Sequence, residues 1–235
     1  MKNKPLDPDQ AREIGIRQKV VRICALFEAE KGKLHWQGEK EPLANLVETI
    51  LSHNTNDRNR DLAYNSLINR YPTWQDVHQA SREELAEVIR SAGLNQQKAE
   101  RIHNLLEFLQ STQGDFTADF LKTLTFDEAV ESLGHLKGIG LKTLAVVMCF
   151  SLGRDIFPVD THVHRLCRRL GFVPDSFDAV KTFQAMRTKV PDGKSYQFHL
   201  HLIQHGREIC HARKPECEKC IVQKDCLYYF QLLRH

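Results

Sequence analysis

The chain has 235 residues, of which 41% are hydrophobic and 27% are charged, and its formal net charge is +3. This balance is typical of a soluble globular protein, and the longest uninterrupted apolar run, residues 144–150, is far too short to span a membrane. The first residues, MKNKPLDPDQAREIG, lack the apolar core of a signal peptide, so we expect a cytoplasmic protein with reduced thiols.

The first strong helical pattern begins at Pro42, because proline favours the first turn of a helix. Apolar residues then recur with the i, i+3, i+4, i+7, i+8 spacing of one helix face: Leu43, Leu46, Val47, Ile50 and Leu51. Asn56 is placed to cap a second helix, which runs through Leu67 and Ile68. These patterns predict two consecutive helices.

Capping boxes mark two further helix starts. Ser81 with Glu84, and Thr125 with Glu128, each place a hydroxyl three residues before a glutamate. Between them, residues 96–109 carry one apolar face, formed by Ala99, Ile102, Leu105, Leu106 and Leu109. No stretch of alternating β-branched residues indicates a sheet. We therefore expect an all-α fold.

Residues 135–147, HLKGIGLKTLAVV, predict two helices joined by a tight turn. Residues 89–102 show a weaker form of the same pattern. Glycine permits positive φ and a close approach of the backbone to a ligand. The amides at the start of the second helix favour an anion. Gly138 and Gly140 are therefore candidates for binding a nucleic-acid phosphate, although a plain turn between helices explains the two glycines equally well.

Positive charge is concentrated around this turn. Residues 137–169 contain six Lys or Arg against two Asp, so the segment carries +4 and the remainder of the chain is slightly acidic. Such a segment favours a polyanionic partner, and a solvated helix face is the plainer alternative.

Two residues of this segment have the chemistry of a catalytic pair. Lys142 falls in the first turn of a predicted helix, where the helix dipole and apolar neighbours disfavour an ammonium, and an amine of lowered pKa is a better nucleophile. Asp160 is placed to cap a helix with a buried face of Val163, Leu166, Cys167 and Leu170. A surface lysine and a simple cap are the alternatives, and spacing alone does not establish that the two meet.

Four of the seven cysteines follow the spacing C-x6-C-x2-C-x5-C: Cys210, Cys217, Cys220 and Cys226. Clustered thiols in a reducing compartment indicate a metal site. Structural zinc sites usually combine two short ligand pairs, whereas this segment has one CxxC, and the spacing also differs from ferredoxin runs. Zinc and an iron–sulfur cluster both remain open on these grounds. The other cysteines lie in helical patterns and are expected to be small buried residues: Cys24, Cys149 and Cys167.

The sequence LKGIGLKTLAVVMCF, then VDTH, then the cysteine spacing together resemble endonuclease III, from about residue 43 to residue 226. The resemblance implies a bifunctional DNA glycosylase and AP lyase of the helix-hairpin-helix superfamily. The expected partner is double-stranded DNA containing oxidised pyrimidines or abasic sites. The four clustered cysteines are implied to ligate a [4Fe–4S] cluster. We expect a monomer without membrane contact.

The resemblance also implies roles for individual residues and a layout. Lys142 matches the lysine nucleophile and Asp160 the catalytic aspartate, while Asn54 and Leu94 match residues that intercalate into DNA. A six-helix barrel domain with the hairpin is implied for residues 36–154. A second, discontinuous domain is implied for residues 1–35 and 155–235, with the cluster loop at about 210–226 and the active site in the cleft between the two domains.

Some positions depart from the family pattern. Asn54 stands where glutamine is common, and Lys137 precedes the first hairpin glycine in place of proline. Within the cysteine segment, Arg213 and Lys214 are expected to project towards the DNA backbone, with a solvated loop as the alternative. Two other functions stay open: a glycosylase for uracil or mismatched thymine with weak lyase activity, and a catalytically inactive lesion-binding protein.

Overall fold

The computed structural model describes residues 7–233. All regular elements within that range are α- or 3-10 helices, and it contains no β-strand, so the all-α prediction is confirmed. None of the helices in these residues is both long and apolar enough to cross a membrane. The chain forms two compact units, Gly38–Arg154 and the discontinuous pair Met1–Gln37 with Asp155–His235. The ends of the predicted second domain, residues 1–6 and 234–235, lie outside the described residues.

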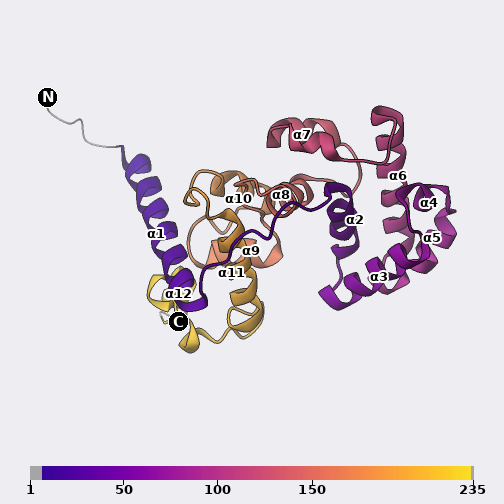
Figure 1. Ribbon diagram of the computed structural model, residues 1–235. Helices are drawn as coiled ribbons and strands as arrows, with labels where there is room; N and C mark the ends of the chain where they lie inside the picture. Colours follow the sequence, from indigo (N-terminus) through magenta and orange to yellow (C-terminus); the bar gives the residue numbers. More distant parts are fainter. Residues whose placement is uncertain (1–6, 234–235) are drawn as a thin grey trace, which may run out of the picture. The chain divides into compact units, whose positions relative to one another are not determined.

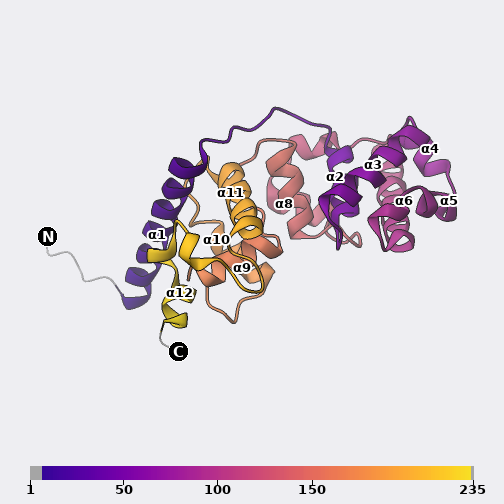
Figure 2. The ribbon, with the colours of Figure 1, turned by 90° about the horizontal axis from the view of Figure 1, so that it is seen from below.

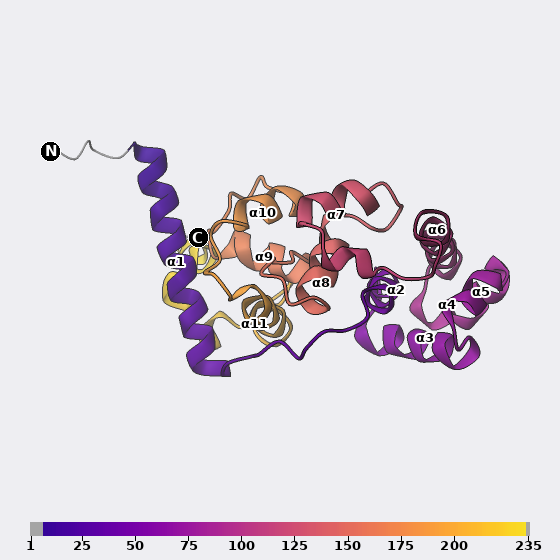
Figure 3. The same cartoon turned by 45° about the horizontal axis from the view of Figure 1, so that its top comes forward.

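The continuous unit contains the helices drawn from indigo to salmon in Figure 1: α2 (Pro42–Ser52), α3 (Asp57–Arg70), α4 (Trp74–Gln79), α5 (Arg82–Val88), η1 (Arg90–Ala92), α6 (Asn95–Gln113), η2 (Asp119–Lys122), α7 (Phe126–Leu133) and α8 (Leu141–Phe150). The helix α2 packs against α3, α6 and α8, and α5 packs against α6. Figure 3 shows α3, α4, α5 and α6 gathered into one group, with α7 beside α8. The predicted apolar stripe of α2 is fully buried in this core.

Local capping fixes where these helices begin. The Asn56 side chain accepts a hydrogen bond from the Asn59 amide at 2.9 Å, as predicted. Both predicted capping boxes form, at the starts of α5 and α7. A further box at the start of α4, between Thr73 and Asp76, was not predicted. Each box satisfies backbone amides that have no acceptor within their own helix.

The discontinuous unit contains α1 (Pro8–Lys31), α9 (Thr161–Arg169), α10 (Ala179–Met186), α11 (Ser195–Glu208), η3 (Cys217–Lys219), η4 (Gln223–Asp225) and α12 (Leu227–Leu232). The helix α11 packs against both α1 and α9, and Figure 2 shows α1 running beside α11. Phenylalanine rings fill the space between them: Phe27, Phe157, Phe172 and Phe198. This core is built from both ends of the chain.

Polar contacts also join α1 to the C-terminal part of this unit. The Glu28 carboxylate accepts hydrogen bonds from Lys194 Nζ at 2.6 Å and from Gln197 Nε2 at 2.7 Å. These bonds lower the pKa of Glu28 to about 2, and the bond from Lys194 has the larger effect. Arg22 pairs with Asp225, which precedes the last cysteine of the cluster. The N-terminal helix is therefore an integral part of the unit that carries the cysteines.

Candidate active site and cysteine cluster

The glycine hairpin lies between α7 and α8. Gly138 has φ +92°, the left-handed region that favours glycine, and a Cβ added there would lie 2.7 Å from Cδ of Arg101. Gly140 is different, because its φ of −102° is open to any residue and nothing lies within 4 Å of an added Cβ. Only the first of the two glycines is therefore required by the backbone of the turn, whereas the second leaves open space at the helix start.

The start of α8 has no side-chain cap. Its N-cap is Gly140, in contrast to α7, where the Thr125 side chain accepts a hydrogen bond from the Glu128 amide. Thr143 in the first turn of α8 instead donates to the Gly138 carbonyl oxygen at 3.0 Å. The first amides of a helix have no acceptor within the helix, so this uncapped end suits an anion.

Lys142 lies in the first turn of α8, as predicted, and is half-buried beside the buried Thr143. The side chain of His53, at the end of α2, lies 3.4 Å from Thr143 Oγ1 through its Nε2. Burial, followed by the positive charges of Lys142, Arg101 and Lys98, lowers the pKa of His53 to about 4. His53 is therefore neutral at neutral pH. The sequence pattern did not associate His53 with the hairpin, because the two are far apart in the chain.

Asp160 is the N-cap of α9, as predicted, and its Oδ1 accepts from the Val163 amide at 2.7 Å. The predicted apolar face of α9 is buried. Asp160 belongs to the discontinuous unit and Lys142 to the continuous one.

Asn54 and Leu94, the two residues expected to intercalate into DNA, are called the wedge residues below. Both lie in the continuous unit and both have a left-handed backbone conformation. Asn54 has φ +54° and Leu94 has φ +47°, although neither is glycine. The left-handed conformation costs about 1–2 kcal/mol for a residue with a Cβ. Both side chains are exposed, and Leu94 is 48% exposed although it is apolar. Asparagine tolerates the left-handed region, so the strain concerns Leu94, where a strained backbone presents an apolar side chain to solvent and adds nothing to the core.

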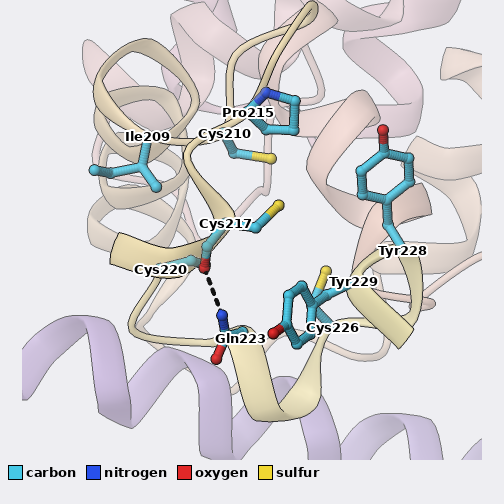
Figure 4. A pocket seen from close by; sticks show the side chains of 9 residues that line it. All are labelled: Ile209, Cys210, Pro215, Cys217, Cys220, Gln223, Cys226, Tyr228 and Tyr229. Atoms are coloured by element: carbon cyan, nitrogen blue, oxygen red, sulfur yellow. Dashed lines mark hydrogen bonds between the residues drawn. The ribbon is translucent and has the colours of Figure 1, made fainter. Parts of the chain in front are cut away.

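The four clustered cysteines line one small pocket, part of it open to solvent, together with Ile209, Pro215, Gln223, Tyr228 and Tyr229 (Figure 4). Gln223 donates to the Cys217 carbonyl oxygen at 2.9 Å across the base of this pocket. Among residues 7–233, no three His, Cys, Asp or Glu side chains converge closely enough to hold a single metal ion.

The surroundings of three of these cysteines disfavour the thiolate form when no metal is bound. Burial raises the pKa of Cys220 to about 11 and also raises the pKa values of Cys217 and Cys226. Without a metal, the thiolates are thus disfavoured at neutral pH, whereas a bound metal deprotonates its thiol ligands. Two nitrogens lie beside the sulfurs: Arg169 Nη1 donates to Cys210 Sγ at 3.2 Å, and His205 Nε2 is hydrogen-bonded to Cys220 Sγ at 3.3 Å.

Two arginines of α9 hold the first part of the cysteine segment. Arg165 donates to the carbonyl oxygens of Gly206 at 2.9 Å and Cys210 at 3.0 Å. Arg169 donates to the carbonyl oxygens of His211 at 2.7 Å and Ala212 at 3.0 Å. These side chains were counted in the basic segment that favours a polyanion, but their donors serve the protein itself. Their i, i+4 spacing on one helix face was the available signal.

Arg213 and Lys214 are exposed on the loop between the first two cluster cysteines, as predicted. The loop is closed by backbone hydrogen bonds from Glu216 to Ile209, at 2.9 Å, and from Cys210 to His205, at 2.8 Å. Lys214 has φ +52°. The remaining three cysteines are buried, as predicted: Cys24, Cys149 and Cys167.

Comparison with known proteins gives the family. The family model described as "HhH-GPD superfamily base excision DNA repair protein" matches residues 47–192, which include the hairpin, Lys142 and Asp160. Endonuclease III of Thermotoga maritima is 32% identical over 191 residues, which are 81% of this chain and 85% of that protein. The chain belongs to the endonuclease III family. Within the HhH-GPD superfamily, this is a family of base excision DNA repair proteins.

Two further matches extend the comparison. An Arabidopsis thaliana protein named "Putative DNA glycosylase At3g47830" is 36% identical over 176 residues, 75% of this chain and 60% of that protein. The chain thus matches less than two thirds of the plant protein's length. The solved "Structure of a non-covalent Endonuclease III-DNA Complex" has a TM-score of 0.80 at 25% identity, covering 93% of this chain and 99% of that one. The predicted endonuclease III family and its helix-hairpin-helix fold are confirmed.

Proposed function

We propose that this endonuclease III family member is a bifunctional DNA glycosylase and AP lyase that acts on oxidised pyrimidines and abasic sites in double-stranded DNA. The observation that carries the proposal is the half-buried Lys142, in the first turn of α8 directly after the glycine hairpin. An amine at the start of an uncapped helix stands beside a site suited to a phosphate. A nucleophile and a backbone-binding element are thus joined in one short segment.

Lys142 would act as the nucleophile. Its neutral amine would form a bond to C1′ of the flipped nucleotide while the glycosidic bond breaks and the base leaves with a proton. The sugar ring would open to a Schiff base on Nζ. Loss of the C2′ proton would then break the C3′–O bond and cut the strand, and water would hydrolyse the imine to release Lys142. Covalent catalysis of this kind divides one difficult displacement into easier steps.

Asp160 would act as the ionised partner. Its carboxylate, held by the Val163 amide, would stabilise positive charge on the sugar and accept a proton from the attacking amine.

Other residues would contact the DNA backbone and fill the gap left by the flipped base. The open helix start after Gly140 would take a phosphate, and Arg213 with Lys214 would add charge along the backbone. Leu94 and Asn54 would fill the space left in the duplex, since inserted side chains compensate for unstacking. None of these contacts reads the base sequence.

The four clustered cysteines would hold a [4Fe–4S] cluster. The clustering of four cysteines around one pocket supports this proposal, because four cysteine thiolates are the usual ligands of such a cluster. When bound, such a group would supply rigid cross-links between ligands and positive charge that keeps the thiolates ionised. The chain's own contribution is to fix the loop: Arg165 and Arg169 hold its first part while Arg213 and Lys214 stay exposed.

The test is borohydride trapping on a duplex with one abasic site, followed by a panel of duplexes with oxidised pyrimidines, uracil or mismatched thymine. Wild-type protein should give a covalent adduct, and Lys142→Gln should give none. Absence of an adduct from wild type, with binding retained, would identify an inactive lesion-binding protein instead. Release of uracil or thymine alone would assign the other glycosylase specificity. A colourless, zinc-loaded protein would exclude the iron–sulfur cluster.

A further inference from the structure

Lys98 is a lysine with no exposed surface. It lies in the first half of α6 with 0% exposure, and its Nζ donates to the carbonyl oxygens of Leu51 and Ala92, each at 2.8 Å. Burial, assisted by the charge of Arg101, lowers the pKa of Lys98 to about 8. Burying an ammonium is costly, and an apolar side chain of similar length would fill the same volume. Core packing therefore does not explain this lysine.

The two carbonyls that Lys98 binds belong to the ends of two helices. Leu51 lies in the last turn of α2 and Ala92 is the last residue of η1. Carbonyl oxygens at helix ends have no partner within their helix, so each needs a hydrogen-bond donor from elsewhere. One nitrogen serves both, and this brings two backbone segments that are 41 positions apart in the sequence together at a single atom.

Each of these helix ends leads directly into a turn that carries one of the wedge residues, Asn54 or Leu94; these two turns are called the wedge turns. The backbone after Leu51 reaches Asn54 within three residues, and the backbone after Ala92 reaches Leu94 within two. Both wedge residues are in the left-handed conformation and both are exposed. Such a conformation persists only where the surrounding structure fixes it. The Lys98 amide also donates to the Leu94 carbonyl oxygen at 3.0 Å, so the residue binds this turn through its backbone as well.

We infer that Lys98 is a positioning residue, which holds the turns of Asn54 and Leu94 in one fixed relation so that both side chains enter the duplex together. This inference rests on the proposed function, because insertion into DNA belongs to it. Lys98 itself touches neither the DNA nor the reacting atoms. Its side chain is fully buried and its donors are committed to two carbonyls of the protein.

The deciding measurement is hydrogen exchange in the free protein, which needs no activity. In Lys98→Met the amides of residues 52–57 and 91–95 should exchange about tenfold faster or more, because two bonds from a charged donor are lost. Exchange in α8 should stay within a factor of about two. A variant with unchanged exchange in either turn would overturn the inference, whether or not the wild-type protein acts on DNA.

A second measurement follows insertion itself. A 2-aminopurine placed opposite an abasic site should show a slower and smaller fluorescence rise with Lys98→Met, and the single-turnover trapping rate should fall about 10- to 100-fold. Affinity for undamaged duplex should change less than about twofold, since Lys98 neutralises no phosphate. Loss of trapping with normal 2-aminopurine fluorescence would contradict a positioning role.

The matched control is Lys189→Met in the discontinuous unit. Lys189 is 6% exposed and donates to the Ala185 carbonyl oxygen at 2.9 Å, but it joins no wedge turn. Its replacement should leave both turns and the trapping rate unchanged. If Lys98→Met does not fold, Lys98→Gln, with a shorter donor, takes its place with the same readouts. If wild-type protein forms no adduct, the proposed function fails while the exchange result still decides the role of Lys98.

Discussion

Replacing Arg169 with Met should loosen the cysteine segment by an amount that the structure allows us to work out. Arg169 makes two half-buried hydrogen bonds, to Cys210 Sγ and the His211 carbonyl oxygen, and its guanidinium lies 4.5 Å from the centre of the Tyr228 ring. At about 0.75–1 kcal/mol for each bond and about 0.5–1 kcal/mol for the ring contact, the loss is about 2–3 kcal/mol. We omit the bond to Ala212 because it is exposed.

Such a loss raises the population of the opened loop about 30- to 150-fold. The assay is trypsin cleavage of the bond between Arg213 and Lys214, followed by mass spectrometry on the protein as isolated; the next bond is blocked by Pro215. Cleavage that requires loop opening should accelerate by the same factor when opening is fast relative to cleavage.

The control is Arg168→Met on the same helix. Arg168 pairs with Asp175 at 3.2 Å, with 40% and 67% of the two side chains exposed, so its loss should cost at most about 0.5 kcal/mol. Equal cleavage rates for the two variants would refute the reasoning, because they would show that the hydrogen bonds of Arg169 do not hold the loop.

Three further predictions concern catalysis, DNA binding and pH. Asp160→Asn should keep the cap of α9, since asparagine caps as well as aspartate, but should lower the single-turnover rate about 100-fold or more; an unchanged rate would remove Asp160 from the chemistry. Arg213→Ser should reduce the slope of log affinity against log salt by about 0.9, and an unaltered slope would mean that Arg213 touches no phosphate. Glu28 has a folded pKa of about 2, below its value of about 4.3 in an unfolded chain, so its stabilisation is present above pH 4.3 and is lost as the pH falls towards 2. Urea unfolding should show this loss in wild type and a flatter profile in Glu28→Gln, and identical profiles would contradict it.

Local features of the fold could be predicted from sequence because their causes lie within one helical turn. The caps at Asn56, Ser81, Thr125 and Asp160 each involve a partner three residues away, and all four form. Stripes such as that of α2 are equally local, because the spacing of apolar residues alone determines which face is buried.

The N-terminal helix α1 is harder to predict from the sequence than the helices of the continuous unit. Val20, Ile23, Cys24 and Phe27 are buried and follow the helical spacing, but Val21 and Leu26 are apolar and exposed, which blurs the stripe. Its packing against α11 depends on residues more than 160 positions away, such as the pair of Glu28 with Lys194. Periodicity alone contains no information about that partner.

The candidate site could be predicted only where a motif marks it. The hairpin, Lys142, Asp160 and the cysteine spacing are each readable within a few residues. The contacts of Arg169 with the cysteine segment span 41 or more positions, and those of Lys98 with Leu51 span 47. The uses of both side chains follow from tertiary packing, which no local pattern reveals.

The division of one unit between the two ends of the chain has a consequence for biosynthesis. A chain made from its N-terminus produces α1 first, yet α11, its packing partner, emerges more than 160 residues later. The unit Gly38–Arg154 is continuous and can fold while the rest of the chain is still being synthesised. Cys226, the last of the four clustered cysteines, follows the whole of that unit in the sequence, so the proposed metal group could bind all four thiols only after Gly38–Arg154 has been made. Interrupted chains would thus retain the hairpin with Lys142 but lack the loop that carries Arg213 and Lys214.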